Sequence, residues 1–218
     1  MRASSQPEFW DIRYKREDHL FGTGPNAFVA SQAGRVPRGA NVVELGAGEG
    51  RNLIHLAETR GCHSTAVDFA PAALQQAEAL ATEHGVALEA VQADVRTWQP
   101  NTQWDAVLVT FVQLLPHERP GFYELIRQIV RPGGWVLGEW FRPKHLDGGF
   151  DRIGPNAADR MVTADELRHH FDDFAIAHCE SLEVTLAEGD RLRGRAAVVR
   201  LAAQAPSVEN TTAREARG

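Results

Sequence analysis

Short apolar runs alternate with stretches of helical periodicity along the chain from Val42 onward. A short apolar run that ends at a polar residue is typical of a buried strand, and apolar residues three and four apart indicate an amphipathic helix. The alternation predicts a parallel sheet with helices on both faces. The first predicted strand starts at Val42 and stops at the acidic Glu44. The other predicted strands are 63–67, 87–91, 104–109, 135–140, 174–184 and 195–202, and the predicted helices include 51–60, 71–84 and 122–130.

Residues 7–36 precede the first strand, and their pattern predicts two short helices. Trp10 and Tyr14 lie one turn apart on one face of the first helix, and Pro25 suits the first turn of the second. These helices either pack against the core or form a lid over a ligand cleft, and the sequence leaves both possibilities open. We therefore expect a helical cover at residues 1–38, a core domain at 39–204 and a disordered polar tail at 205–218.

The length of 218 residues, with 43% hydrophobic and 24% charged residues, indicates one globular domain. No apolar run approaches the roughly 20 residues that span a bilayer, so no membrane segment is expected. The first residues lack an apolar signal core, which predicts a cytoplasmic protein. The oligomeric state stays open between a monomer and a homodimer.

The net charge is −6 and no dense Lys/Arg block occurs, so nucleic acid is not an expected partner. Cys62 and Cys179 have neither CxxC nor metal-ligand spacing. We expect both to be small buried thiols, with no disulfide and no metal site.

The stretch from Glu44 to Gly50 holds three glycines spaced by two, and it joins a predicted strand to a predicted helix. Glycine lets a ligand lie against the backbone without a Cβ in the way, so this loop is a candidate ligand site. A dinucleotide loop needs G-x-G-x-x-G, but Arg51 stands at the position of its third glycine. A dinucleotide-dependent oxidoreductase is therefore a weaker alternative, and a glycine turn without a ligand is another.

Acidic residues follow the next two predicted strands. Asp68 lies 18 residues after Gly50, near the offset at which a strand-tip carboxylate accepts hydrogen bonds from ribose hydroxyls. Asp94 is placed to accept a hydrogen bond from an adenine amino group, and the Val95 N–H can serve a ring nitrogen. The residues after the fourth strand, Thr110 and Phe111 among them, emerge where doubly wound sheets bind ligands.

Residues 42–140 resemble the catalytic core of class I S-adenosylmethionine (SAM)-dependent methyltransferases. The resemblance rests on residues 44–50, Asp68, the run 93–95 and the Arg-Pro-Gly-Gly run at 131–134. It implies a Rossmann-like α/β fold, whose seven-stranded, mostly parallel sheet is closed by an antiparallel last strand. It also implies SAM as cofactor and S-adenosylhomocysteine (SAH) as product. Residues 48–57, with 10–14 and 24–26, are similar to the tellurite-resistance and thiopurine-type small-molecule methyltransferases.

The resemblance, together with the strand-tip positions, assigns cofactor-binding residues to the N-terminal segment, the glycine loop and the strand ends. They are Trp10, Tyr14, Glu44, Gly46, Ala47, Gly48, Gly50, Asn52, Asp68, Phe69, Asp94, Val95, Thr110 and Phe111.

Methyl transfer from a sulfonium requires a close, aligned and partly desolvated nucleophile. A soft nucleophile such as a thiol, or a selenium or tellurium oxyanion, needs no general base, whereas oxygen or nitrogen often does. Tellurite-type relatives often carry a His-Arg pair in the last hairpin, where this chain has Leu192 before Arg193. We therefore expect a small acceptor with a soft nucleophile, and the remaining alternative is a SAM-binding module without catalysis. The candidate acceptor-side residues are His117, Trp140, Arg193 and Arg195, and the arginines suit an anionic acceptor.

Overall fold

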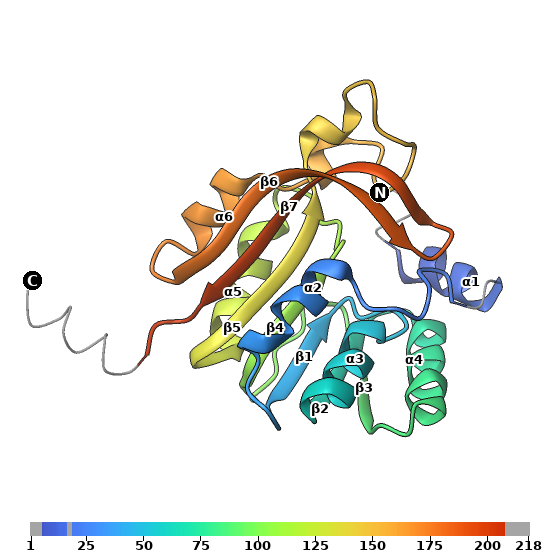
Figure 1. The fold of residues 1–218 in the computed structure, drawn as a ribbon, viewed down its shortest axis with the longest axis vertical. Coiled ribbons are helices and arrows are strands. Elements are labelled where there is room, and N and C mark those ends of the chain that lie inside the picture. The colour runs from blue at the N-terminus through green and yellow to red at the C-terminus, as the bar shows by residue number, and fades with distance from the viewer. Residues whose placement is uncertain (1–5, 17–18, 208–218) are drawn as a thin grey trace, which may run out of the picture.

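The computed structural model describes residues 6–16 and 19–207 and contains a seven-stranded sheet with strand order β3-β2-β1-β4-β5-β7-β6 (Figure 1). Strands β1 to β5 are parallel, and β7 pairs antiparallel with both β5 and β6. The predicted fold class, including the antiparallel last strand, is confirmed. The strands are β1 (Asn41–Leu45), β2 (His63–Asp68), β3 (Leu88–Gln92), β4 (Trp104–Thr110), β5 (Val130–Phe141), β6 (Ala175–Glu188) and β7 (Leu192–Gln204).

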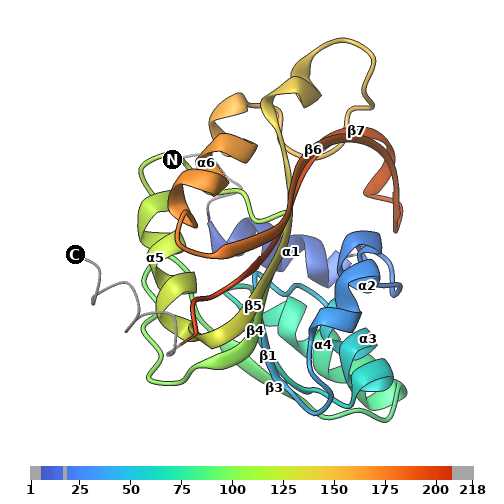
Figure 2. The same cartoon turned by 60° about the vertical axis from the view of Figure 1, so that its left-hand side comes forward.

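Helices cover both faces of the sheet. Figure 2 shows α5 and α6 on one face and α2, α3 and α4 on the other. Across the described ranges, no helix has the length and apolar character needed to cross a membrane. The helices are α1 (Pro7–Arg16), α2 (Ala27–Gln32), α3 (Arg51–Arg60), α4 (Pro71–Glu83), α5 (Arg119–Ile129) and α6 (Ala164–His170), with 3-10 turns η2 (Ala33–Arg35), η3 (Pro143–Leu146) and η4 (Ala158–Arg160).

The strand residues alternate between two hydrophobic cores. Val43 and Leu45 pack in the core that contains α5 and α6, whereas Val42 packs in the core that contains α2 and α3. All three side chains are fully buried. Because successive side chains of a strand point to opposite faces, a central strand covered on both faces is apolar along its length. The continuous apolar runs in the sequence therefore predicted these strands correctly.

Strand β5 begins five residues earlier than the expected start at residue 135. Val130 pairs with Trp104 and Trp135 pairs with Ala106, so the residues between them form an irregularity in the strand. Gly133 has a φ of 77°, a left-handed conformation that glycine adopts readily. The Pro-Gly-Gly run is thus a bulge within β5, and not the stop between a helix and a strand that the sequence suggested.

The β6–β7 hairpin is longer than predicted, and its strands extend until Glu188 pairs with Leu192. Both residues are buried although the turn between them is polar. A Cβ at Gly189 would lie 2.4 Å from the Gly22 nitrogen, so only glycine permits this approach of the two backbones. The hairpin tip therefore packs directly against the N-terminal segment, far from it in sequence.

The first residue of the predicted tail packs against the end of the sheet. Ala205 is buried, and its N–H donates to the Gly134 carbonyl at 2.8 Å. Residues 208–218 lie outside the described residues, so disorder there stays a prediction.

Helix α2 begins after Asn26, whereas the sequence placed Pro25 in its first turn. The Asn26 Oδ1 accepts hydrogen bonds from the N–H groups of Phe28 and Val29, both at 3.0 Å. This is the N-cap arrangement that satisfies the free donors at a helix start. Pro25 therefore precedes the cap.

Asn26 is also the centre of a buried ionic cluster, which we call the Asn26 network. Its Nδ2 donates to Glu139 of β5 at 2.5 Å and to Glu188 of β6 at 2.8 Å. Arg51 of α3 pairs with Glu188, and Arg200 of β7 donates to Glu139 at 2.6 Å. The network joins the N-terminal segment, the helix after the glycine loop, the sheet and the hairpin tip.

We expect Asn26→Ala to lower the free energy of unfolding by about 2 to 4 kcal/mol, because it removes a helix cap and a hydrogen-bond donor to two buried carboxylates. Urea unfolding of this variant and of Asn101→Ala, which removes an exposed asparagine, measures the difference. Equal unfolding midpoints for the two variants would contradict a structural role for the network.

Candidate functional site

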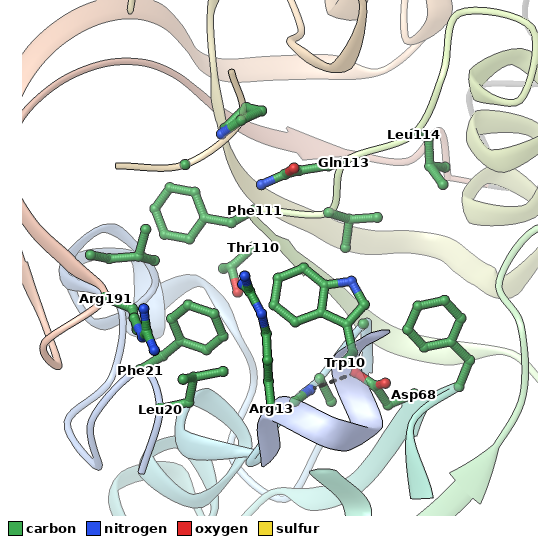
Figure 3. A pocket seen from close by; sticks show the side chains of 18 of the residues that line it. Trp10, Arg13, Leu20, Phe21, Asp68, Thr110, Phe111, Gln113, Leu114 and Arg191 are labelled. Atoms are coloured by element: carbon green, nitrogen blue, oxygen red, sulfur yellow. Dashed lines mark hydrogen bonds between the residues drawn. The ribbon is translucent and has the colours of Figure 1, made fainter. Parts of the chain in front are cut away.

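A cavity of about 630 Å³ lies at the carboxyl ends of the parallel strands. Doubly wound sheets bind their ligands at this edge. Figure 3 shows side chains of α1 and side chains at the end of β4 reaching into the cavity from opposite sides. The remaining walls come from the glycine loop, the ends of β2, β3 and β5, the segment 152–160 and the hairpin turn. All predicted cofactor-binding residues except Glu44 and Gly50 line this cavity.

The glycine loop is the floor of the cavity. Gly46, Gly48 and Gly50 have φ values of 69°, 55° and 71°. A Cβ at Gly48 would lie 2.7 Å from the Tyr14 hydroxyl oxygen. Gly50 instead faces α4, where its Cβ would lie 3.2 Å from that of Ala77. The first two glycines therefore let the cavity-lining side chains of Val112 and Tyr14 lie against the loop, whereas Gly50 lets α3 and α4 pack closely.

Glu44 lies beneath the loop and away from the cavity. One carboxylate oxygen accepts hydrogen bonds from Asn52 at 2.6 Å and Thr110 at 3.0 Å, and the residue is 1% exposed. Burial raises the pKa of Glu44 to about 7. Asn52 and Thr110 both line the cavity, so Glu44 holds two site residues in place without being part of the lining.

Asp68 stands at the end of β2, on the cavity wall beside Phe69. Its two oxygens accept hydrogen bonds from the N–H groups of Gly48 and Ala70, each at 2.9 Å. Burial raises the pKa of Asp68, against the effect of these backbone hydrogen bonds. A carboxylate has about four acceptor positions, so lone pairs remain for a ligand.

Asp94 and Val95 line the cavity at the end of β3. The Asp94 carboxylate accepts a hydrogen bond from Arg96 Nε at 2.8 Å, and Arg96 also pairs with Glu118 at 3.1 Å. Burial acts to raise the pKa of Asp94, but the hydrogen bonds from Arg96 hold it below its ordinary value. A ligand donor at Asp94 would therefore share the carboxylate with a guanidinium.

Helix α1 both packs on α4 and lines the cavity, so the structure combines the two possibilities left open by the sequence. Asp11 accepts a hydrogen bond from the Ala72 N–H at 2.9 Å on the α4 side. On the other side, Trp10 and Tyr14 face the cavity with ring centroids 6.3 Å apart. Figure 3 shows Trp10 and Arg13 pointing from α1 into the cavity. Burial raises the pKa of Tyr14 well above its ordinary value.

The structure brings none of the four candidate acceptor-side residues into the cavity lining. His117 and Arg193 are exposed. Trp140 is buried in the core next to α5 and α6. The Arg195 side chain is 62% exposed and lies 3.8 Å from Glu183. These placements correct the sequence-based geometry of the acceptor end.

The neighbours of these residues line the cavity instead. Phe141 follows Trp140, and Leu192 precedes Arg193. Adjacent strand residues face opposite sides, so a shift of one position replaces a cavity residue with a core or surface residue. Gln113 belongs to the run after the fourth strand that the sequence placed at the ligand-binding edge. Sequence reasoning missed Arg152, Arg160 and Arg191, which line the cavity from loops and turns that lack a periodic signal.

We expect the free energy of unfolding to fall as pH rises from about 5 to 8, because the Glu44 pKa is about 7 in the folded chain and 4.5 ordinarily. The folded state then binds the Glu44 proton more tightly than the unfolded state does. Glu44→Gln should remove about 2 to 3 kcal/mol of this fall. Urea unfolding between pH 5 and 8 measures it, with the exposed Glu78→Gln as control. Identical pH slopes for the two variants would refute this assignment.

Comparison with known proteins gives one match to a family model and several structures with a similar fold. Residues 42–134 match a family model described as a methyltransferase domain. None of the curated proteins compared matches the chain. Three solved structures share the fold at 15–17% sequence identity.

The first is TehB from Haemophilus influenzae, with a TM-score of 0.70, 16% identity and 91% of this chain covered. This chain spans 66% of that TehB chain. The second, described as the conversion of a disulfide bond into a thioacetal group during echinomycin biosynthesis, has a TM-score of 0.71 and 17% identity and covers 97% of both chains. The third is the N-methyltransferase NodS from Bradyrhizobium japonicum in complex with SAH, with a TM-score of 0.67, 15% identity and 92% and 99% coverage.

Proposed function

We propose that the chain is a class I, SAM-dependent methyltransferase that transfers the methyl group of SAM to a small molecule with a soft nucleophile. The match of residues 42–134 to a methyltransferase-domain model and the fold shared with TehB and NodS support the first part of this proposal. The acceptor atom, a thiolate sulfur or a selenium or tellurium oxyanion centre, forms a bond to the methyl carbon. The sulfonium C–S bond breaks and its electron pair stays on sulfur, which yields SAH. A thiol acceptor loses its proton to solvent before the attack.

The cofactor site proposed here follows the strand ends. The methionine part of SAM lies over Gly46 and Gly48, and the ribose hydroxyls donate to the lone pairs that Asp68 retains. Adenine lies at Asp94 and Val95. Trp10 and Tyr14 cover the ligand from α1, where aromatic faces suit a sulfonium.

The proposal of a soft nucleophile rests on the described part of the cavity lining, which offers no uncommitted side chain to act as a general base. Within the residues that the structure describes, the cavity lining contains no histidine. Its carboxylates already have other tasks. Glu49 holds the N–H groups of Leu20 and Phe21, Glu118 holds Leu115 N–H and pairs with Arg96, Asp94 pairs with Arg96, and the remaining lone pairs of Asp68 take the ribose in the proposed cofactor site. A thiolate or a chalcogen oxyanion needs orientation and desolvation more than proton removal. The disulfide named for the echinomycin structure is consistent with sulfur chemistry on this fold.

Nitrogen methylation is a second candidate, favoured by the N-methyltransferase NodS among the similar structures. An amine that is neutral near pH 7 could also react without a base. The two candidates predict methyl transfer to different acceptors, thiols or chalcogen oxyanions in one case and amines in the other.

Asp68→Ala should weaken SAH binding by about 1 to 3 kcal/mol, the cost of losing a charged hydrogen-bond partner. Isothermal calorimetry measures it, with Asp172→Asn, which changes an exposed carboxylate, as control. Thermal unfolding without ligand must show that the Asp68 variant is folded, because Asp68 also anchors the glycine loop. Unchanged affinity would remove Asp68 from the cofactor site.

Assays with labelled SAM should detect methyl transfer to thiols, selenite or tellurite and little transfer to amines and phenols. For a series of thiols, the pH at which kcat/KM levels off should follow the pKa of each acceptor, because no enzyme base is used. Transfer to amines alone would support the second candidate. SAH binding without transfer to any acceptor would support a non-catalytic module.

A further inference from the structure

The segment between β5 and α6 brings two arginines to the acceptor side of the cavity, Arg152 and Arg160. Arg160 ends η4, is 3% exposed and donates from Nη1 to the Gln113 carbonyl at 3.0 Å. This carbonyl follows β4, so the Arg160 guanidinium is held against the loop from which Phe111 enters the cavity. A buried guanidinium on a cavity wall is a strong site for an oxyanion.

The segment is fixed in place by the hairpin and by η3. Asp151 and Arg195 exchange two hydrogen bonds, from Asp151 N–H to the Arg195 carbonyl at 3.0 Å and from Arg195 N–H to the Asp151 carboxylate at 2.6 Å. The His145 ring Nε2 lies 2.7 Å from the Ile153 carbonyl oxygen. Both arginines are therefore presented from an anchored segment, which lowers the entropy cost of binding a ligand.

The charges around the cavity do not balance. Among the described residues, six arginines but four carboxylates line it. Within the described residues 6–16 and 19–207, neither Arg13 nor Arg152 forms an ion pair with a carboxylate. The Arg13 guanidinium instead stacks 4.1 Å from the Phe9 ring centroid. Bound SAM would bring two positive groups, its sulfonium and its ammonium, and one negative group, its own carboxylate. The acceptor therefore enters a positive field, which favours an anion.

An apolar wall stands beside these cations. The rings of Phe111 and Phe141 lie 5.2 Å apart, and Leu192 extends the same hydrophobic cluster. Phe111 has a φ of 56°, an unusual conformation for a bulky residue, and its N–H donates to the Glu139 carbonyl at 2.8 Å. Strain of this kind persists where the surrounding structure fixes a side chain, and here it points the Phe111 ring into the cavity (Figure 3).

We propose that the methyl acceptor is a small amphipathic anion whose carboxylate or similar oxyanion binds Arg152 and Arg160. Its apolar body lies against Phe111 and Phe141. The inference rests on the proposed function in one respect, that the cavity takes a small acceptor next to SAM. It does not depend on which atom is methylated.

Four acceptors test the charge and the nucleophile separately: 3-mercaptobenzoate, thiophenol, 3-hydroxybenzoate and phenol. The inference predicts that the carboxylated member of each reactive pair has a kcat/KM about 10- to 100-fold higher, the range for a hydrogen bond to a charged group. Transfer to both thiols with equal kcat/KM would overturn the anion inference and leave the soft nucleophile standing. Transfer to 3-hydroxybenzoate but to neither thiol would overturn the soft nucleophile and support the anion inference.

Variants of the arginines locate the effect. Arg152→Ala and Arg160→Lys should lower kcat/KM for the carboxylated member alone, and Arg160→Lys keeps a charge in case a neutral residue there prevents folding. Arg38→Ala removes an exposed arginine before β1, at the opposite end of the sheet. It should leave kcat/KM unchanged for both the carboxylated and the neutral acceptor. Equal losses for the carboxylated and neutral members would contradict anion recognition.

A binding measurement covers the case in which none of the four compounds is methylated. Benzoate titrated into the SAH-bound protein should bind the wild type and Arg38→Ala alike, and Arg152→Ala about 10-fold more weakly. Benzoate binding that is the same in all three proteins, or absent in all three, would overturn the inference.

Discussion

The cavity depends on the burial of the Asn26 network. Two carboxylates and two guanidiniums removed from water are stable together only when each has its partners, because an unpaired buried charge costs several kcal/mol. Asn26 is the neutral link, fully buried between Glu139 and Glu188. Its backbone N–H also donates to Asn52 at 2.7 Å, and Asn52 lines the cavity. One set of hydrogen bonds therefore positions the N-terminal segment, the glycine loop and the tip of the β6–β7 hairpin.

The acids and the arginines of the site have different tasks. Glu44, Glu49 and Asp68 hold the protein's own N–H and hydroxyl groups, and they fix the loop, the cover and the strand ends. This use of carboxylates shapes a rigid site, and the cofactor proposed for it is cationic at the sulfonium. Within the part of the chain that the structure describes, Arg13 and Arg152 line the cavity without an ion pair to a carboxylate, so both are available to the proposed anionic acceptor. Such a separation lets one cavity accept two ligands of different charge.

The sequence predicted the cavity wall at the glycine loop and the ends of β2 and β3 far better than the wall at Phe141 and Leu192. Strands covered on both faces are apolar throughout, and the glycine loop and Asp68 follow them at short, recognisable offsets. The second wall depends on which face of its strand each side chain takes: Phe141 and Leu192 line the cavity, whereas Trp140 and Arg193 do not. An alternation of period two cannot be oriented from local sequence when both neighbours are large. The pairing of Arg51 with Glu188 spans 137 residues and has no local signal at all.

The contact between Gly22 and Gly189 has a consequence for how the chain is made. Asn26 and its partner Glu188 are 162 residues apart, so the polar groups of Asn26 wait for a part of the chain that is made much later before they are satisfied. Domains fold as units during synthesis, and exposed apolar surface invites aggregation or proteolysis in the interval. A chain cut short before the hairpin would keep the glycine loop and the strands that precede it, but its cover would have nothing to close against. The cavity can therefore close only after the β6–β7 hairpin has been synthesised.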